Sequence, residues 1–224
     1  MKNILKLLIV LIGFTMTTES YAQTFGVKAG LNLSNLLVED DNETYSDDYE
    51  MNPGFHVGAT AEFRITQLFS FETGLLFSTK GFKISGEESI FGVAIQYESK
   101  MNLFYLDIPL TAKASFDLGS AKIYGVFGPY IGMGLSGKSK YETTTLGETE
   151  TGEEDINWGS DEVEDDLKRL DFGLTMGAGV EISAIQIGLS YGLGLANILP
   201  YNDDGSRISN RVLSISVGYK FGGK

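Results

Sequence analysis

The chain has no cysteine, one histidine and four prolines among its 224 residues, and it is poor in positive charge. Without cysteine no disulfide holds the fold, so an exported protein of this kind needs another source of stability, which a sheet closed on itself can supply. Lys and Arg number 17 against 30 Asp and Glu, a formal net charge of −13. This balance argues against nucleic acid as a partner, because phosphate binding needs clustered basic residues.

Long apolar runs are also missing. The apolar stretch at residues 7–14 follows two lysines and is too short to cross a bilayer, and nothing after it approaches the roughly 18 apolar residues of a transmembrane helix. Small residues at positions 20 and 22 suit signal peptidase. We therefore predict a secretory signal peptide over residues 1–22 and one domain over residues 23–224. The alternative for the first segment is a retained membrane anchor.

What the chain does have is an apolar residue at every second position, in eight segments of about ten residues. Such alternation gives each strand one apolar and one polar face, and repeated segments of this length are typical of a transmembrane β-barrel. The pattern predicts an all-β fold, an antiparallel up-and-down barrel of eight strands. The segments are residues 25–35, 54–65, 69–78, 104–114, 121–135, 170–182, 185–195 and 213–221.

The connections between these segments alternate in length. Those after the second, fourth and sixth segments are short, whereas the one between the fifth and sixth has about thirty residues. Outer-membrane barrels have short periplasmic turns and long extracellular loops, so this order predicts which end faces outward. The fifth segment is ambiguous because both of its faces are apolar or glycine. There we expect four residues to face outward, namely Ile123, Phe127, Ile131 and Met133.

The polar faces carry many glycines and a few long charged side chains. An eight-stranded barrel is just wide enough to be filled by side chains, and buried charges are tolerated when they are paired. We predict an ion-pair network that plugs the barrel; the alternative is a gated ion path along the same charges. Five inward candidates are cationic and five anionic: Lys28, Arg64, Lys113, Arg169 and Lys220, and Glu62, Glu72, Asp107, Asp171 and Glu181.

Signatures of catalysis and metal binding are weak. No serine lies in a Gly-x-Ser-x-Gly elbow, and His56 is expected to be an inward or rim polar residue. Residues 40–42 and 202–206 could supply calcium ligands, but neither completes a calcium loop, and solvated acidic loops are the alternative. We therefore predict no enzyme activity, no catalytic or cofactor-binding residues, no cofactor and no metal.

The apolar stretch near residues 90–95 allows two interpretations. It could be an exposed loop tip that contacts a partner, or part of a long hairpin standing above the membrane. We favour the hairpin because Ala94, Gln96, Glu98 and Lys100 continue the alternation of a strand.

Several short motifs in order give the chain a resemblance to the PorT-like outer-membrane β-barrel family. The resemblance implies a small eight-stranded barrel in the outer membrane, in a family whose namesake is tied to type IX secretion and gliding, with no catalytic residues to carry over. It covers essentially the whole chain after residue 22. The residues that carry it are Gly26 to Asn32, Tyr105 to Leu110, Phe127 to Tyr130, Phe172 to Glu181 and Tyr191 to Ile198.

These observations predict a non-enzymatic integral outer-membrane barrel, monomeric, that contacts outer-membrane lipid. Its acidic outer loops would meet ions, a surface polymer or another protein, or support the envelope or secretion. One alternative is a secreted lipocalin-like barrel, which turns its apolar face inward around a small ligand. The others are a narrow channel and a lipid-modifying enzyme with His56 as its base.

Overall fold

The computed structural model describes residues 23–39, 50–90, 93–201 and 206–222. The predicted signal peptide lies outside this part of the chain, and it stays a prediction. Within the described residues no helix is long and apolar enough to cross a membrane. Nine strands account for most of them: β1 (Gln23–Glu39), β2 (Asn52–Arg64), β3 (Phe69–Ile90), β4 (Val93–Asp117), β5 (Lys122–Thr145), β6 (Glu148–Asp155), β7 (Leu170–Ile182), β8 (Ile185–Gly194) and β9 (Arg207–Phe221).

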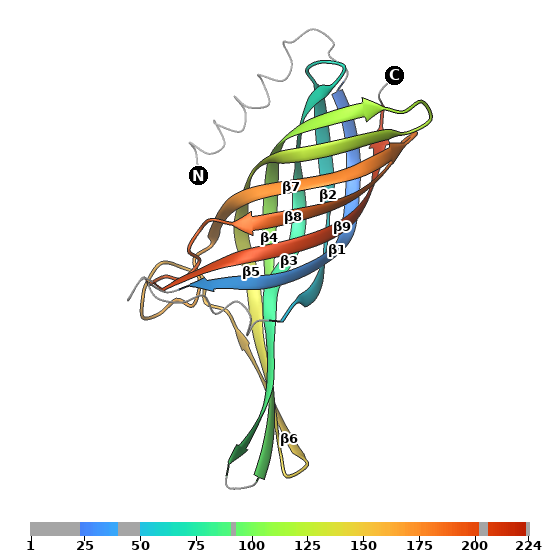
Figure 1. Cartoon of the computed structure of the whole chain (residues 1–224). Coiled ribbons are helices and arrows are strands. Elements are labelled where there is room, and N and C mark those ends of the chain that lie inside the picture. The colour runs from blue at the N-terminus through green and yellow to red at the C-terminus, as the bar shows by residue number, and fades with distance from the viewer. Residues whose placement is uncertain (1–22, 40–49, 91–92, 202–205, 223–224) are drawn as a thin grey trace.

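Eight of these strands close into a ring (Figure 1). Each strand pairs antiparallel with the next along the chain, β5 passes to β7, and β1 returns to β9 with Phe25 opposite Phe221. β6 pairs with β5 alone and stands outside the ring. Closure satisfies the backbone hydrogen bonds of every strand in the ring, which a sheet needs in order to cross a membrane. The predicted eight-stranded barrel is confirmed.

The apolar rows face outward all round the barrel. On β5, where the sequence pattern was ambiguous, Ile123, Phe127, Ile131 and Met133 are all exposed, so that prediction is confirmed. A lipocalin-like barrel would need the opposite arrangement, with the apolar rows inside. Other exposed apolar residues of the barrel wall include Phe25, Val27, Leu31, Phe55, Val57, Phe69, Leu75, Ile108, Phe172, Leu189, Ile215 and Val217.

The two ends of the barrel differ. Three short connections, residues 65–68, 118–121 and 183–184, lie at the end where β1 begins and β9 finishes, here called the turn end (Figure 1). The prediction of a thirty-residue loop between the fifth and sixth segments is wrong in part. β5 continues to Thr145 and the chain returns as β6, through a turn in which Leu146 and Gly147 have φ of 55° and 84°.

Three neighbouring strands continue far beyond the barrel. β3, β4 and β5 have 22, 25 and 24 residues, whereas about 9–11 suffice to cross a bilayer. Their outer halves and β6 form a four-stranded antiparallel sheet, here called the arm, which projects from the end opposite the turns (Figure 1). The long-hairpin interpretation is therefore confirmed, since Ala94 to Lys100 pair with Ser89 to Lys83.

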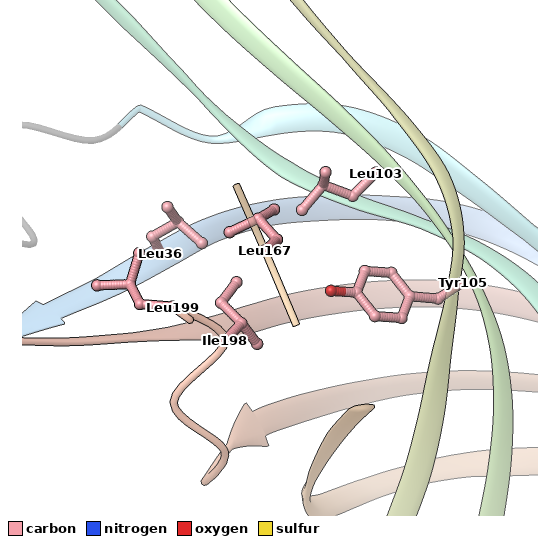
Figure 2. Packing of buried hydrophobic residues seen from close by; sticks show 6 residues of the cluster. All are labelled: Leu36, Leu103, Tyr105, Leu167, Ile198 and Leu199. Carbon is pink, nitrogen blue, oxygen red and sulfur yellow. The ribbon is translucent and has the colours of Figure 1, made fainter. Parts of the chain in front are cut away.

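At the arm end the barrel mouth is filled by a buried hydrophobic cluster, here called the apolar cap. β1 and β4 stand on opposite sides of the ring, yet Leu36 and Leu103 belong to the same cluster, so the cap spans the lumen. Figure 2 shows Tyr105 pointing into it from β4, and the Trp158 ring meets the Tyr105 ring edge-on at 5.6 Å. The members of the cap are Leu36, Leu103, Tyr105, Leu167, Ile198 and Leu199.

Candidate functional site in the barrel interior

The charged side chains inside the barrel fall into two clusters. The one nearer the turns, here called the turn-side cluster, contains three ammonium and three carboxylate groups from six strands: Lys28, Glu62, Glu72, Lys113, Glu181 and Lys220.

Lys113 is the centre of the turn-side cluster. Its side chain is fully buried, and its Nζ lies 3.0 Å from Glu62 Oε2, 3.4 Å from Glu72 Oε2 and in contact with Glu181 Oε1. Lys28 Nζ lies 2.7 Å from Glu72 Oε1, and Lys220 Nζ lies 2.7 Å from both Glu62 and Glu181. The numbers of positive and negative groups are therefore equal, as buried charge requires.

The second cluster lies nearer the cap, and is here called the cap-side cluster. Lys80 Nζ is 2.9 Å from both Asp107 Oδ1 and Asp171 Oδ2, so one ammonium serves two carboxylates. Neutral donors compensate: the Tyr130 hydroxyl donates to Asp171 at 3.2 Å and Asn210 Nδ2 donates to Asp171 at 3.0 Å. Because Lys80 is on β3 and Asp171 on β7, this bridge also crosses the lumen.

Eight of the ten predicted inward charges lie in these clusters, but Arg64 and Arg169 do not. Both side chains are exposed; Arg64 ends β2, and Arg169 precedes β7 and donates to the Gly134 carbonyl at 3.1 Å. At the ends of strands a long guanidinium side chain reaches water and avoids burial. The prediction missed Lys80, although the alternation that places Ser78 inside also places Lys80 there.

A cavity of about 130 Å³ lies between the two clusters. His56 borders it, buried, with its Nδ1 2.8 Å from Asn32 Oδ1; the Ser214 hydroxyl donates to the same oxygen at 2.8 Å. The imidazole thus has an amide as its hydrogen-bond partner, which confirms His56 as an inward polar residue. Gly188 and Gly192 of β8 line the opposite wall, where small residues leave room for the long charged ones.

Metal ligands do not gather in the described part of the chain: no group of three or more His, Asp or Glu side chains there is arranged to hold an ion. The calcium candidates at residues 40–42 and 202–206 lie outside the described residues, apart from Ser206, whose carbonyl accepts a hydrogen bond from Asn197. The absence of catalytic, cofactor and metal residues therefore stays a prediction.

The arm has its own ion pairs on one of its faces. Lys83 Nζ lies 2.8 Å from Glu98, and Glu153 contacts Lys138 and lies 2.7 Å from Lys140. Hydrogen bonds from Lys138 and then from Lys140 lower the pKa of Glu153 to about 2. The hydrogen bond with Glu98 raises the pKa of Lys83.

The chain is similar in sequence to one protein family and in structure to several solved proteins. Residues 21–199 match the family model described as outer membrane protein beta-barrel domain. No curated protein matches the sequence. Among solved structures, Ail of Yersinia pestis is similar at 17% identity, covering 90% of this chain and 100% of that one, with a TM-score of 0.33. Neisserial surface protein A is similar at 13% identity, covering 88% of this chain and 97% of that one, with a TM-score of 0.42. The Escherichia coli outer membrane protease OmpT is similar at 8% identity, covering 92% of this chain and 99% of that one, with a TM-score of 0.32.

Proposed function

Because the chain belongs to the outer membrane protein beta-barrel family, we propose that it is a non-enzymatic outer-membrane barrel, closed to ions, that holds its arm at the cell surface. The observation that carries this proposal is the continuity of β3, β4 and β5 from the lipid-facing wall into the arm. A sheet that shares its strands with a closed barrel needs no flexible linker. The barrel would act as an anchor and the arm as the element that meets a partner.

Closure to ions is supported by three successive obstructions along the lumen. An ion would have to pass the turn-side cluster, then the cap-side cluster, then the apolar cap. Lys113 and Lys80 each hold carboxylates on more than one strand. Displacing Lys80 leaves Asp107 and Asp171 without a cation, and displacing Lys113 leaves three carboxylates to share two ammonium groups; either change is costly in a buried site. The charges would therefore serve as a plug, in preference to a gated path.

We retain three finer predictions as part of this proposal. They are a PorT-like assignment with a role in envelope or secretion support, a signal peptide over residues 1–22, and a monomeric barrel in outer-membrane lipid.

Planar-bilayer recording of the purified protein tests closure. We expect no steady conductance from the natural chain. The variant Lys113→Ala/Glu72→Ala removes two long side chains from the centre of the turn-side cluster and widens the lumen there, but the cap-side cluster and the apolar cap stay in place beyond it, so we expect this variant to remain closed as well. Reproducible single-channel steps from the natural protein would contradict a sealed interior.

Orientation of the arm is tested by epitope insertion and antibody labelling of intact cells. An epitope between Leu146 and Gly147, in the turn before β6, should be labelled without permeabilisation. The matched control is an epitope between Gly119 and Ser120, in a short connection at the turn end, which should need permeabilisation. The reverse pattern would show that the arm points into the periplasm.

A further inference from the structure

The two faces of the arm differ in chemistry, and the strand register shows how. Lys83, Lys100 and Lys140 stand opposite one another on three adjacent strands, on the face that also carries the ion pairs described above. The opposite face, here called the apolar arm face, is the continuation of the inward face of the barrel. Its apolar residues are Phe82, Ile84, Ile95, Tyr97, Met101 and Tyr141.

The apolar arm face runs from the buried cap to exposed tyrosines. Leu103 is fully buried, Phe82 and Met101 pack partly buried against the cap, and further out Tyr97 and Tyr141 are 38% and 46% exposed. An antiparallel sheet normally packs one face against a core and leaves the other to water. Here the packed part of the face ends where the arm leaves the barrel, and the outer part presents aromatic surface.

Tyr141 reaches the margin of the sheet. It stands opposite Gly152 of β6, and a β-carbon at Gly152 would overlap the Tyr141 ring. The ring therefore lies across the glycine, above the edge strand. A side chain that arrived along the outer edge of β6 would meet this ring.

β6 is an edge strand with unbalanced charge. Among the described residues it pairs with β5 on one side only, so its other side presents unpaired backbone groups. Five of its eight residues are acidic. Glu153 and Asp155 have lysine partners on the polar face. On the apolar arm face the register places Glu148, Glu150 and Glu154, for which the described part of the chain shows no ion pair.

We propose that the outer edge of β6, with Tyr141, docks an extended cationic segment of a partner protein, which adds to the arm as a fifth strand. Strand addition uses main-chain hydrogen bonds for affinity and alternate side chains for specificity. In register, the added strand would place Lys or Arg beside Glu150 and Glu154 and an apolar residue beside Gly152, in contact with Tyr141. This inference rests on the proposed function, because it needs the arm to be exposed at the cell surface.

Charge selects this occupant over a second copy of the chain. Two β6 edges brought together would set the same row of carboxylates against itself, and like charges on neighbouring strands are destabilising. A basic segment instead supplies the missing counter-charges. The contact is confined to one eight-residue edge, so it belongs with small, transient interfaces.

The probe is a fluorescent peptide, Lys-Thr-Val-Thr-Lys-Thr-Lys, titrated by anisotropy against the full chain in nanodiscs. Binding should weaken at least tenfold in Glu148→Gln/Glu150→Gln/Glu154→Gln, and also in Tyr141→Ser, and should weaken as salt rises. The matched control, Glu98→Gln/Glu142→Gln, removes carboxylates from the polar face and should leave affinity unchanged. A peptide with glutamate in place of lysine should not bind.

Any of the following results would overturn the inference: no binding at millimolar peptide, equal binding of the acidic peptide, or binding insensitive to the triple variant. Binding of a neutral oligosaccharide that needs Tyr97 and Tyr141 but not the glutamates would assign the surface to carbohydrate and overturn it as well. Heat-modifiable gel migration checks that each variant is folded. Because peptide binding is measured on purified protein and orientation on intact cells, the inference and the proposed function can fail separately.

Discussion

Replacing Lys113 by methionine should destabilise the barrel strongly, because Lys113 neutralises the centre of the turn-side cluster. Methionine keeps most of the side-chain volume and removes the ammonium. At an effective dielectric of 20, an ion pair at about 3–4 Å is worth roughly 4–6 kcal/mol before desolvation. Glu72 would keep Lys28, and Glu62 and Glu181 would share Lys220, so the cluster would become net negative. Breaking a buried pair of this kind costs about 3–5 kcal/mol.

Urea unfolding in lipid vesicles, followed through the single tryptophan, Trp158, measures this loss. The double variant Lys113→Met/Glu62→Gln leaves the matched pairs Lys28–Glu72 and Lys220–Glu181 and restores charge balance, so it should recover at least about 1 kcal/mol relative to the single variant. The control Lys122→Met removes an exposed lysine 4.0 Å from Asp117 and should change stability by less than about 1 kcal/mol. A loss below about 1 kcal/mol in Lys113→Met, or a double variant less stable than the single, would refute the reasoning.

Two further predictions concern the barrel wall and the arm. A β-carbon at Gly179 would overlap the Ile187 carbonyl oxygen, so Gly179→Val should cost about 1–3 kcal/mol in the same unfolding assay. The control is Gly125→Ala, whose β-carbon would have its nearest neighbour at 3.8 Å and which should lose much less stability. Equal losses of stability in the two variants would contradict the close packing at Gly179. Because its pKa is lowered to about 2, the Glu153 carboxyl should stay ionised as pH falls through 4.5, and its contribution to the arm should disappear only near pH 2. A carbon-13 NMR titration of the Glu153 carboxyl at low salt should have its midpoint near pH 2, and the midpoint should move upward in Lys138→Gln. A midpoint near 4.5 in the natural chain would count against the ion pair.

Which face of each strand points outward could be predicted from the sequence, because residues alternate between two faces and only two assignments are possible. Even on β5, where both faces are apolar or glycine, large residues such as Phe127 are exposed and glycines such as Gly132 face the interior charges. Most of the interior charges followed from the same alternation. The alternation predicts the third segment only as far as residue 78, where its apolar positions become sparse, so Lys80 falls outside the predicted segment.

The arm and the cap were harder to predict, for physical reasons. Strand β6 has no apolar alternation, since it stands in water on both faces and its register is imposed by pairing with β5. The cap brings together Leu36, Leu103 and Ile198 from distant parts of the chain, and no local pattern encodes which loop residues fold over a barrel mouth. Neutral donors such as Asn210, which compensate Asp171, leave no charge signal at all.

The central claim is that the apolar rows face lipid while the ionic rows face a closed interior. The chain has no cysteine, so single cysteines carrying spin labels can be placed without background. Labels at Phe127 and Val217 should be accessible to oxygen dissolved in lipid and shielded from a water-soluble nickel relaxant, whereas labels at Thr175 and Ser216, which line the cavity, should be shielded from oxygen. The opposite phase, with positions 127 and 217 shielded from oxygen and positions 175 and 216 accessible to it, would contradict the membrane-spanning barrel.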